Sequence, residues 1–101
     1  MKVISRRFGR EVFKKQSMIT IHKYQFEIAD SIEIEMPIHS DILSIQLQNN
    51  KPTMWAKVDT SLQKVKRIFV VFGTGHEINS LFDYRHIGTI QMNGFVWHIF
   101  E

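Results

Sequence analysis

From Ile19 to the end of the chain, apolar and polar residues alternate with a period of two, which is typical of β-strands with one buried face. The segment SIEIEM shows this clearly, because Ile32, Ile34 and Met36 alternate with serine and glutamate. Alternation and turn residues together predict seven strands, at residues 19–28, 31–36, 42–48, 53–59, 65–72, 86–92 and 95–100. We therefore expect an all-β domain of mainly antiparallel strands, arranged as a small β-sandwich or an open barrel.

A first hairpin is predicted between strands 42–48 and 53–59. The intervening Asn49-Asn50-Lys51-Pro52 suits a four-residue turn, in which Gln48 would pair with Thr53. That register aligns one apolar face, with Leu47 opposite Met54, Ile45 opposite Ala56 and Leu43 opposite Val58.

A second hairpin is predicted around Asn93-Gly94, because both central positions of a type I′ turn need positive φ. One face pairs Met92 with Phe95, Ile90 with Trp97 and Gly88 with Ile99; the other pairs Gln91 with Val96, Thr89 with His98 and Ile87 with Phe100. Gly88 opposite a bulky residue predicts a close backbone approach or a bend.

Three other segments have distinct patterns. In the first strand the apolar phase slips between His22 and Lys23, which predicts a β-bulge. The run RIFVVF is apolar on both faces, which predicts a central strand covered on each side. Outside the strands, only residues 77–85 and the N-terminal segment could be helical.

The predicted core follows from the aligned apolar faces. It consists of Ile34, Leu43, Ile45, Leu47, Met54, Ala56, Val58, Phe69, Val71, Ile90, Met92, Phe95, Trp97 and Ile99. Trp55 falls on the opposite, polar face beside Lys57, and an exposed tryptophan is a candidate contact residue. The alternative is that a second layer or the N-terminal segment covers it.

Charge separates the chain into two parts. Residues 1–18 carry six Lys or Arg against one Glu, a net +5, whereas residues 19–101 carry seven against nine, a net −2. We expect a basic N-terminal arm at 1–18 and a single β domain at 19–101. The arm could bind nucleic acid or an acidic partner, or it could reflect a start assigned upstream of Met18.

Composition excludes several classes of protein. The chain contains no cysteine, so disulfides, thiolate metal sites and cysteine catalysis are excluded. No apolar stretch approaches the roughly 20 residues of a membrane span, and the N-terminus lacks the apolar region of a secretory signal. A cytoplasmic protein with no membrane association fits these features best.

The segment FGTGH is the strongest local signal for chemistry. It lacks the third glycine of a dinucleotide-binding loop and the Gly-Lys-Ser/Thr of a P-loop, and no helix is predicted after it. We expect Gly73, Thr74, Gly75 and His76 to form a surface turn that ends the central strand. The turn is either purely structural, or it directs His76 towards a partner or a small anion.

No catalytic or metal-binding set is recognisable in the sequence. The five histidines show none of the spacings that bind metals, and no Ser/His/Asp set has the context of a hydrolase. We therefore expect no metal, no cofactor and no enzymatic activity.

The segments TIHKYQFEI, MPIHSDILSIQLQNNKPTMWAKVD, FGTGHEI, YRHIGTIQM and VWHIFE occur in an order that resembles a family of small proteins of unknown function. Members are encoded by bacteriophages and by bacterial genomes, often in prophage regions. The resemblance covers about residues 19–101 and leaves the basic arm outside. It rests on Trp55, Asp59, Gly73, Thr74, Gly75, His76, Gly88, Thr89 and His98, and it implies no particular activity.

The resemblance favours a small accessory phage protein that acts as a non-enzymatic binding module in the cytoplasm of the infected cell. Its expected partner is a host protein, including one of a defence system, or a small nucleotide signal. The candidate binding residues are Trp55, Lys57, Gly73, Thr74, Gly75, His76, Arg85 and His98. Alternatives are nucleic-acid binding through the basic arm and the Trp55-bearing sheet face, or a minor structural role in the virion with homo-oligomerisation through a sheet edge.

Overall fold

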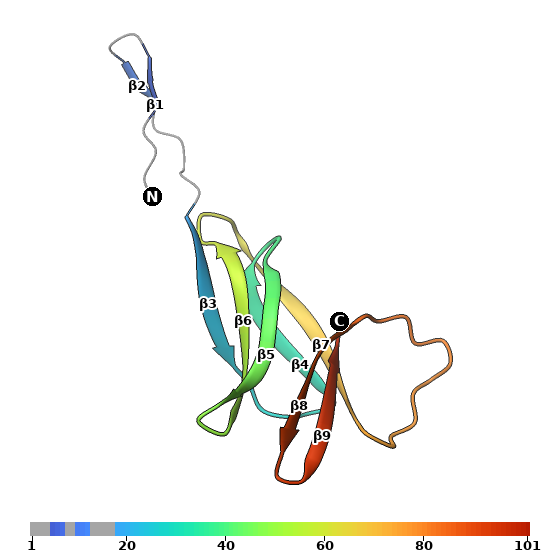
Figure 1. The fold of residues 1–101 in the computed structure, drawn as a ribbon. Helices are drawn as coiled ribbons and strands as arrows, with labels where there is room; N and C mark the ends of the chain where they lie inside the picture. Colours follow the sequence, from blue (N-terminus) through green and yellow to red (C-terminus); the bar gives the residue numbers. More distant parts are fainter. Residues whose placement is uncertain (1–4, 8–9, 13–17) are drawn as a thin grey trace.

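The computed structural model describes residues 5–7, 10–12 and 18–101 of the chain (Figure 1). Its strands are β1 (Ser5–Arg7), β2 (Arg10–Val12), β3 (Ile19–Gln25), β4 (Ser31–Pro37), β5 (Asp41–Gln48), β6 (Lys51–Asp59), β7 (Lys64–Gly73), β8 (His86–Met92) and β9 (Phe95–Phe100). The short β1 and β2 form an antiparallel pair, and β3 to β9 are the seven predicted strands. The described residues contain no helix, so the helical alternative for residues 77–85 is wrong.

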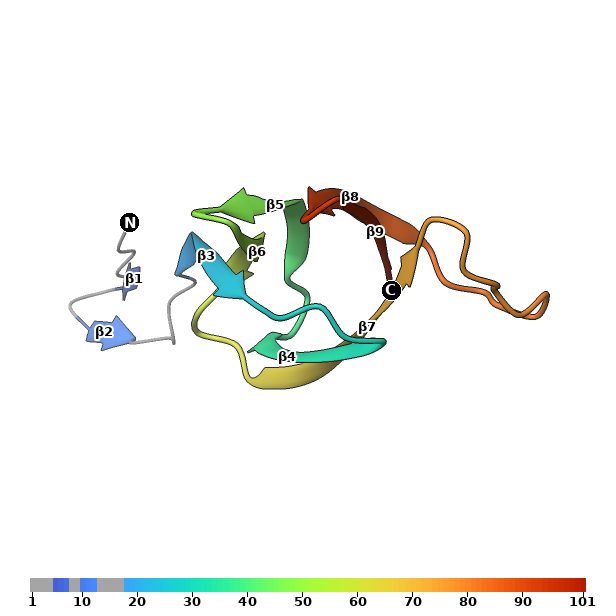
Figure 2. The same cartoon turned by 90° about the horizontal axis from the view of Figure 1, so that it is seen from below.

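The seven strands form two antiparallel sheets that face each other (Figure 2). One sheet has three strands in the order β3-β6-β5, and the other has four in the order β4-β7-β9-β8. β5 lies beside β8, but the sheets do not close into a barrel. The predicted all-β fold of seven antiparallel strands is therefore confirmed, and each sheet has an inner face towards the core and an outer face away from it.

The β5–β6 hairpin has a shorter turn than predicted. Asn49 and Asn50 both have positive φ, and Gln48 pairs with Lys51 instead of Thr53. In a two-residue hairpin the next pair, Leu47 and Pro52, is not hydrogen-bonded, so β5 does not need the missing N–H of Pro52. The register shifts by two residues, which keeps the same faces inward and places Ile45 opposite Met54.

The β8–β9 hairpin has the predicted turn and register over most of its length. Asn93 and Gly94 have φ values of 54° and 81°, and Gly88 pairs with Ile99. A Cβ atom at Gly88 would lie 2.9 Å from the Cβ atom of Ile45, which confirms the close approach. One pair is wrong, because a register shift makes His86, not Ile87, the partner of Phe100.

The bulge predicted in the first strand is absent. β3 pairs with β6 in continuous register from Ile19 opposite Asp59 to Gln25 opposite Thr53. Ile19 and Ile21 lie on the outer face and are exposed, whereas Tyr24 lies on the inner face opposite the buried Met54. The slip in phase therefore reflects apolar residues on the outer face and not an inserted residue.

The inner faces enclose one core, from which two predicted members are missing. The buried hydrophobic residues are Phe26, Ile32, Ile34, Met36, Ile45, Met54, Ala56, Val58, Phe69, Val71, Ile90 and Ile99. Leu47, Met92 and Trp97 are half-buried. Leu43 is 50% exposed because it falls at the register shift of β5, and Phe95 is 61% exposed beside the β8–β9 turn.

β7 is an interior strand between β4 and β9, and both of its faces are covered in part, as predicted. Phe69 and Val71 are buried on its inner face. On its outer face, Phe72 contacts Phe82 with ring centroids 5.2 Å apart. Phe82 belongs to the loop at residues 74–85, which projects from the sheets in Figure 1 and packs against the outer face through this contact.

No described helix is long and apolar enough to cross a membrane.

Candidate binding surfaces

The predicted binding residues lie on two surfaces that point away from each other. Trp55 and Lys57 are on the outer face of the three-stranded sheet, whereas His98 is on the outer face of the four-stranded sheet, opposite Phe72. The turn at residues 73–76 follows β7 at the edge of that second face. Since the core separates the two outer faces, the predicted residues do not form one site within a chain.

The glycine turn is a surface turn that ends β7, as predicted. The His76 N–H donates to the Gly73 carbonyl over 3.0 Å. Gly75 has a φ of 91°, a backbone conformation that would be strained for a residue with a side chain. The Gly73 N–H donates to Nδ1 of His76 over 3.0 Å, and the Thr74 N–H donates to the Val96 carbonyl. Three of the four amides are therefore used within the protein, which leaves this turn poorly suited to cradle a phosphate.

Thr74 and His98, both predicted as binding residues, are brought together in a line of hydrogen bonds with Thr89 and His86. The Thr74 hydroxyl lies 2.8 Å from Nε2 of His98, whose Nδ1 lies 3.2 Å from the Thr89 hydroxyl. That hydroxyl lies 2.8 Å from Nε2 of His86. We call these four residues the His/Thr line. Thr74, Thr89 and His98 also carry the resemblance described above, although they are far apart in sequence.

His86 was missed as a site residue for a definite reason. The predicted pairing of Ile87 with Phe100 would have turned His86 away from His98. The register shift places His86 opposite Phe100 instead, with its ring centroid 6.3 Å from that of His98. The hydrophobic pattern does not reveal the extra residue in β8, because an isoleucine at position 87 fits both the predicted and the observed register.

Arg85 immediately precedes His86 in the chain and takes part in none of the three hydrogen bonds of the His/Thr line. Its backbone N–H and carbonyl both pair with Glu101, at 2.9 Å each, which extends the β8–β9 ladder by one pair. The adjoining loop is packed through Phe82 and Tyr84, whose ring centroids lie 4.7 Å apart. Leu81, at 87% exposure, lies at the surface of this loop.

The outer face of the three-stranded sheet carries a groove whose lining includes three apolar side chains. This shallow groove of about 270 Å³ is lined by Ile21, Leu43, Ser44, Gln46 and Trp55. Trp55 is half-buried and lies between Lys23 and Ser44 on the neighbouring strands. Lys57 lies on the same face, and its ammonium is 3.6 Å from the Asp41 carboxylate. We call the five residues of this groove, together with Lys23, Lys57 and Asp41 around it, the Trp55 face.

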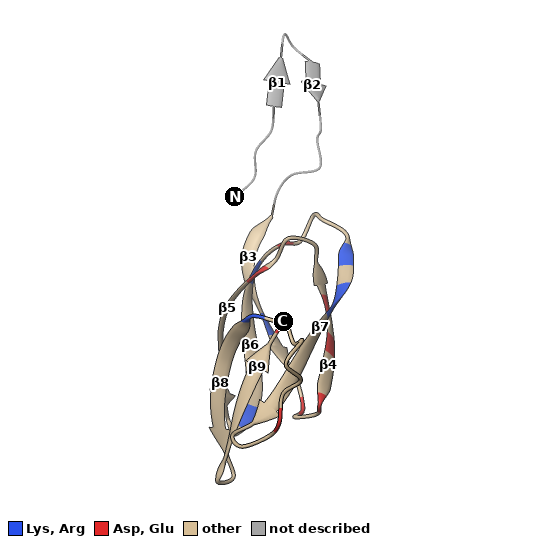
Figure 3. Cartoon of the chain, turned by 90° about the vertical axis from the view of Figure 1, so that its right-hand side faces the viewer, with Lys and Arg blue, Asp and Glu red and all other residues tan. Residues whose placement is uncertain are grey.

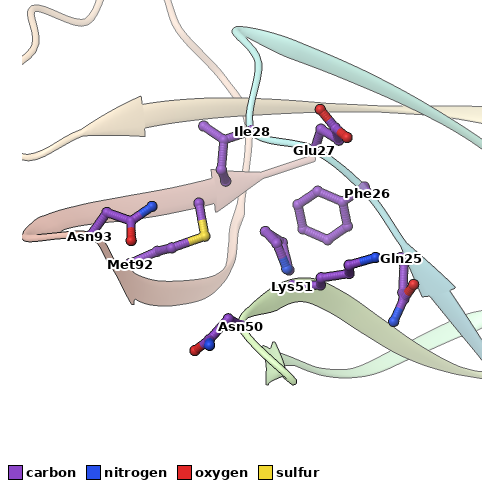
Figure 4. Close-up of a pocket in the computed structure, with 9 residues that line it drawn as sticks. Gln25, Phe26, Glu27, Ile28, Asn50, Lys51, Met92 and Asn93 are labelled. Atoms are coloured by element: carbon purple, nitrogen blue, oxygen red, sulfur yellow. The ribbon is translucent and has the colours of Figure 1, made fainter.

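A larger cleft of about 560 Å³ opens at the end of the sandwich where the two hairpin turns meet (Figure 4). Phe26 points into it, and Met92 and Ile28 line its apolar part. Gln25, Glu27, Asn50, Lys51, Pro52 and Asn93 complete the lining. None of the predicted binding residues is among these, so the cleft does not bring together the residues expected to bind a partner or a nucleotide signal.

Larger clusters of metal-binding side chains are absent from the described residues. Within residues 18–101, which the structure describes together with two short strands of the arm, no group of three or more His, Asp or Glu side chains could hold an ion. The expectation that cofactors are absent remains a prediction.

Residues 18–101 match one protein family, described as Domain of unknown function (DUF7352). The match begins at Met18 and extends to Glu101. No curated protein and no solved structure matches the chain.

Proposed function

The chain belongs to the DUF7352 family, and we propose that it is a non-enzymatic binding module that recognises another protein through the Trp55 face. The resemblance to phage and prophage proteins supports a role for this binding in an infected cell. There the protein is a small accessory protein in the cytoplasm, and its partner is a host protein.

The observation that carries this proposal is the presence of apolar side chains on the outer face of the three-stranded sheet, where they do not contribute to the core. The inner faces already form the core, yet Ile21, Leu43 and Trp55 line a groove on the outer face. Tryptophan is enriched among residues that dominate binding energy in protein interfaces, and exposed apolar patches rimmed by polar residues mark such interfaces. Lys23, Lys57 and Asp41 supply this polar rim.

The charges of the Trp55 face favour a protein over a nucleic acid. Lys57 is paired with Asp41, and Asp59 lies on the same strand, so the positive charges are balanced locally. A phosphate backbone requires a concentration of unpaired cations. On the side of the domain shown in Figure 3, acidic positions of β4 likewise lie beside basic positions of β7, and Lys66 is 3.8 Å from Glu33.

The test is site-specific photo-crosslinking in a bacterial cell that expresses the full chain. A benzophenone amino acid in place of Leu43 reports on the Trp55 face, and the same residue in place of Ile68 is the matched control on the other outer face. We expect a defined protein adduct at Leu43 only, and at least a tenfold loss of that adduct when Trp55→Ala is added. The Trp55→Ala chain should keep the melting temperature of the parent.

Equal adducts at both positions, or an adduct at Leu43 that persists in Trp55→Ala, would contradict the proposal. A nuclease-sensitive adduct would favour the nucleic-acid alternative. That alternative has its own test, since single-stranded DNA or RNA binding that is salt-sensitive and survives deletion of residues 1–17 would place the nucleic-acid site in the β domain.

A further inference from the structure

Two imidazole nitrogens of the His/Thr line converge on one point of the β8–β9 surface. Nε2 of His86 and Nδ1 of His98 lie 2.8 Å and 3.2 Å from the same oxygen, the Thr89 hydroxyl. The two rings come from neighbouring strands and have centroids 6.3 Å apart. The hydroxyl has one proton, so it donates to only one of the two nitrogens and must accept from the other.

Thr74 can fix the tautomer of His98. Its hydroxyl lies 2.8 Å from Nε2, and when Nε2–H donates to that oxygen, the lone pair of Nδ1 is directed at the point shared with His86. Histidines that bind metals have this arrangement, because the ring nitrogen that does not bind the ion donates to an outer acceptor that fixes tautomer and orientation.

The geometry points to a two-histidine site for a divalent transition-metal ion, formed by Nε2 of His86 and Nδ1 of His98. Zinc binds imidazole nitrogen at about 2.0–2.1 Å. An ion at the position of the Thr89 oxygen therefore needs Nε2 of His86 to move by about 0.8 Å and Nδ1 of His98 by about 1.1 Å. Thr89 is exposed, and its hydroxyl can rotate towards water to make room.

The composition of the site determines which ions it selects. Two neutral imidazoles and no thiolate favour copper, nickel and zinc over calcium and magnesium, which require oxygen ligands. Since no third histidine or acidic side chain joins the pair within the described part of the chain, water fills the remaining positions. The affinity order expected from such a site is Cu²⁺ above Ni²⁺ and Zn²⁺.

The experiment is a calorimetric titration of the full-length chain, prepared without a histidine tag, with Cu²⁺, Ni²⁺ and Zn²⁺ in a non-coordinating buffer. We expect one site per chain, and His86→Ala and His98→Gln should each weaken it at least tenfold. The matched controls His22→Ala and His39→Ala should leave it unchanged. Thr74→Val keeps both ligands and should weaken it about tenfold by removing the acceptor for His98.

Electron paramagnetic resonance of the Cu²⁺ complex gives a readout that a fold defect would not imitate. The spectrum should show two equivalent nitrogen couplings in the parent chain and one in His86→Ala. Thr89→Ala should retain both, because the hydroxyl is displaced and is not a ligand. Binding that depends on one histidine alone, or that neither substitution weakens, would overturn the proposal. The site is on the face opposite the Trp55 face, so its failure leaves the proposed protein-binding role intact.

Discussion

The guanidinium of Arg67 donates two parallel hydrogen bonds to the carboxylate of Glu101, from Nε to Oε2 over 2.7 Å and from Nη2 to Oε1 over 2.6 Å. Nη1 of the same group donates to the Ser40 carbonyl over 2.5 Å. Arg67 therefore connects the last residue of the chain to β7 and to the segment between β4 and β5. The bonds to Glu101 raise the pKa of Arg67 above its ordinary value, so the guanidinium stays protonated.

Replacing Glu101 with glutamine should lower the free energy of unfolding by about 2 kcal/mol, because a half-buried guanidinium loses its counter-charge. The side chains of Arg67 and Glu101 are only 21% and 25% exposed. The matched control is Glu33→Gln, whose partner Lys66 is 3.8 Å away and 66% exposed, and which should cost about 0.5 kcal/mol or less. Urea denaturation of the two variants measures the difference, and equal losses would contradict this account.

Substituting Gly88 with alanine should destabilise the contact between the two sheets. The new Cβ would lie 2.9 Å from Cβ and 3.0 Å from Cδ1 of Ile45, and relieving this overlap should cost about 2 kcal/mol. In an Ile45→Ala background the substitution should cost less, since Cδ1 is then absent. Denaturant unfolding of the four chains in this double-mutant cycle tests the coupling, and an identical cost of Gly88→Ala in both backgrounds would refute it.

His76→Ala should reduce stability by about 1 kcal/mol, because the Gly73 N–H loses the Nδ1 acceptor. Asparagine places an oxygen at the same position along the side chain, so His76→Asn should recover part of the loss. Thermal unfolding compares the two. If the two variants unfold at the same temperature, the hydrogen bond is not what holds the turn. If His76→Ala abolishes crosslinking at Leu43 without changing stability, the turn acts in binding.

Tyr24 should make the domain sensitive to alkali. Burial on the inner face raises the pKa of its phenol above the ordinary value of 10.0. A group whose pKa is higher in the folded chain contributes stability below its unfolded pKa, and this is lost as pH rises through the folded value. The free energy of unfolding should therefore fall more steeply above about pH 10 in the parent chain than in Tyr24→Phe. Urea denaturation on both sides of that pH tests this, and parallel curves would contradict it.

The sequence predicts the strands well because a period of two needs only local information. Turn chemistry also predicts the β8–β9 register, since Asn93-Gly94 leaves one choice of turn. It fails at Asn49-Asn50, where two asparagines take positive φ and Pro52 enters the strand. The hydrophobic pattern tolerates that shift, because moving the register by two residues keeps every side chain on its face.

The Trp55 face and the His/Thr line were less predictable, because both depend on which face of a sheet particular side chains occupy. Leu43 is a predicted core residue, yet it lines the Trp55 face together with Ile21. The His/Thr line depends on a register shift in β8 and on a turn that follows another strand. Such contacts join segments far apart in the chain and leave no local signal.

The strand order also determines when the chain can fold during its synthesis. β3 pairs with β6, and β4 pairs with β7, so each of these early strands lacks a hydrogen-bonded neighbour until a much later segment has been made. Within residues 18–101, only β5 and β8 pair with the strand that immediately follows them, β6 and β9 respectively. Pairing between distant segments is entropically costly and slow. On the ribosome, therefore, the β5–β6 hairpin is the first unit that can form within residues 18–101, and the four-stranded sheet is completed only when Glu101 is free to meet Arg67.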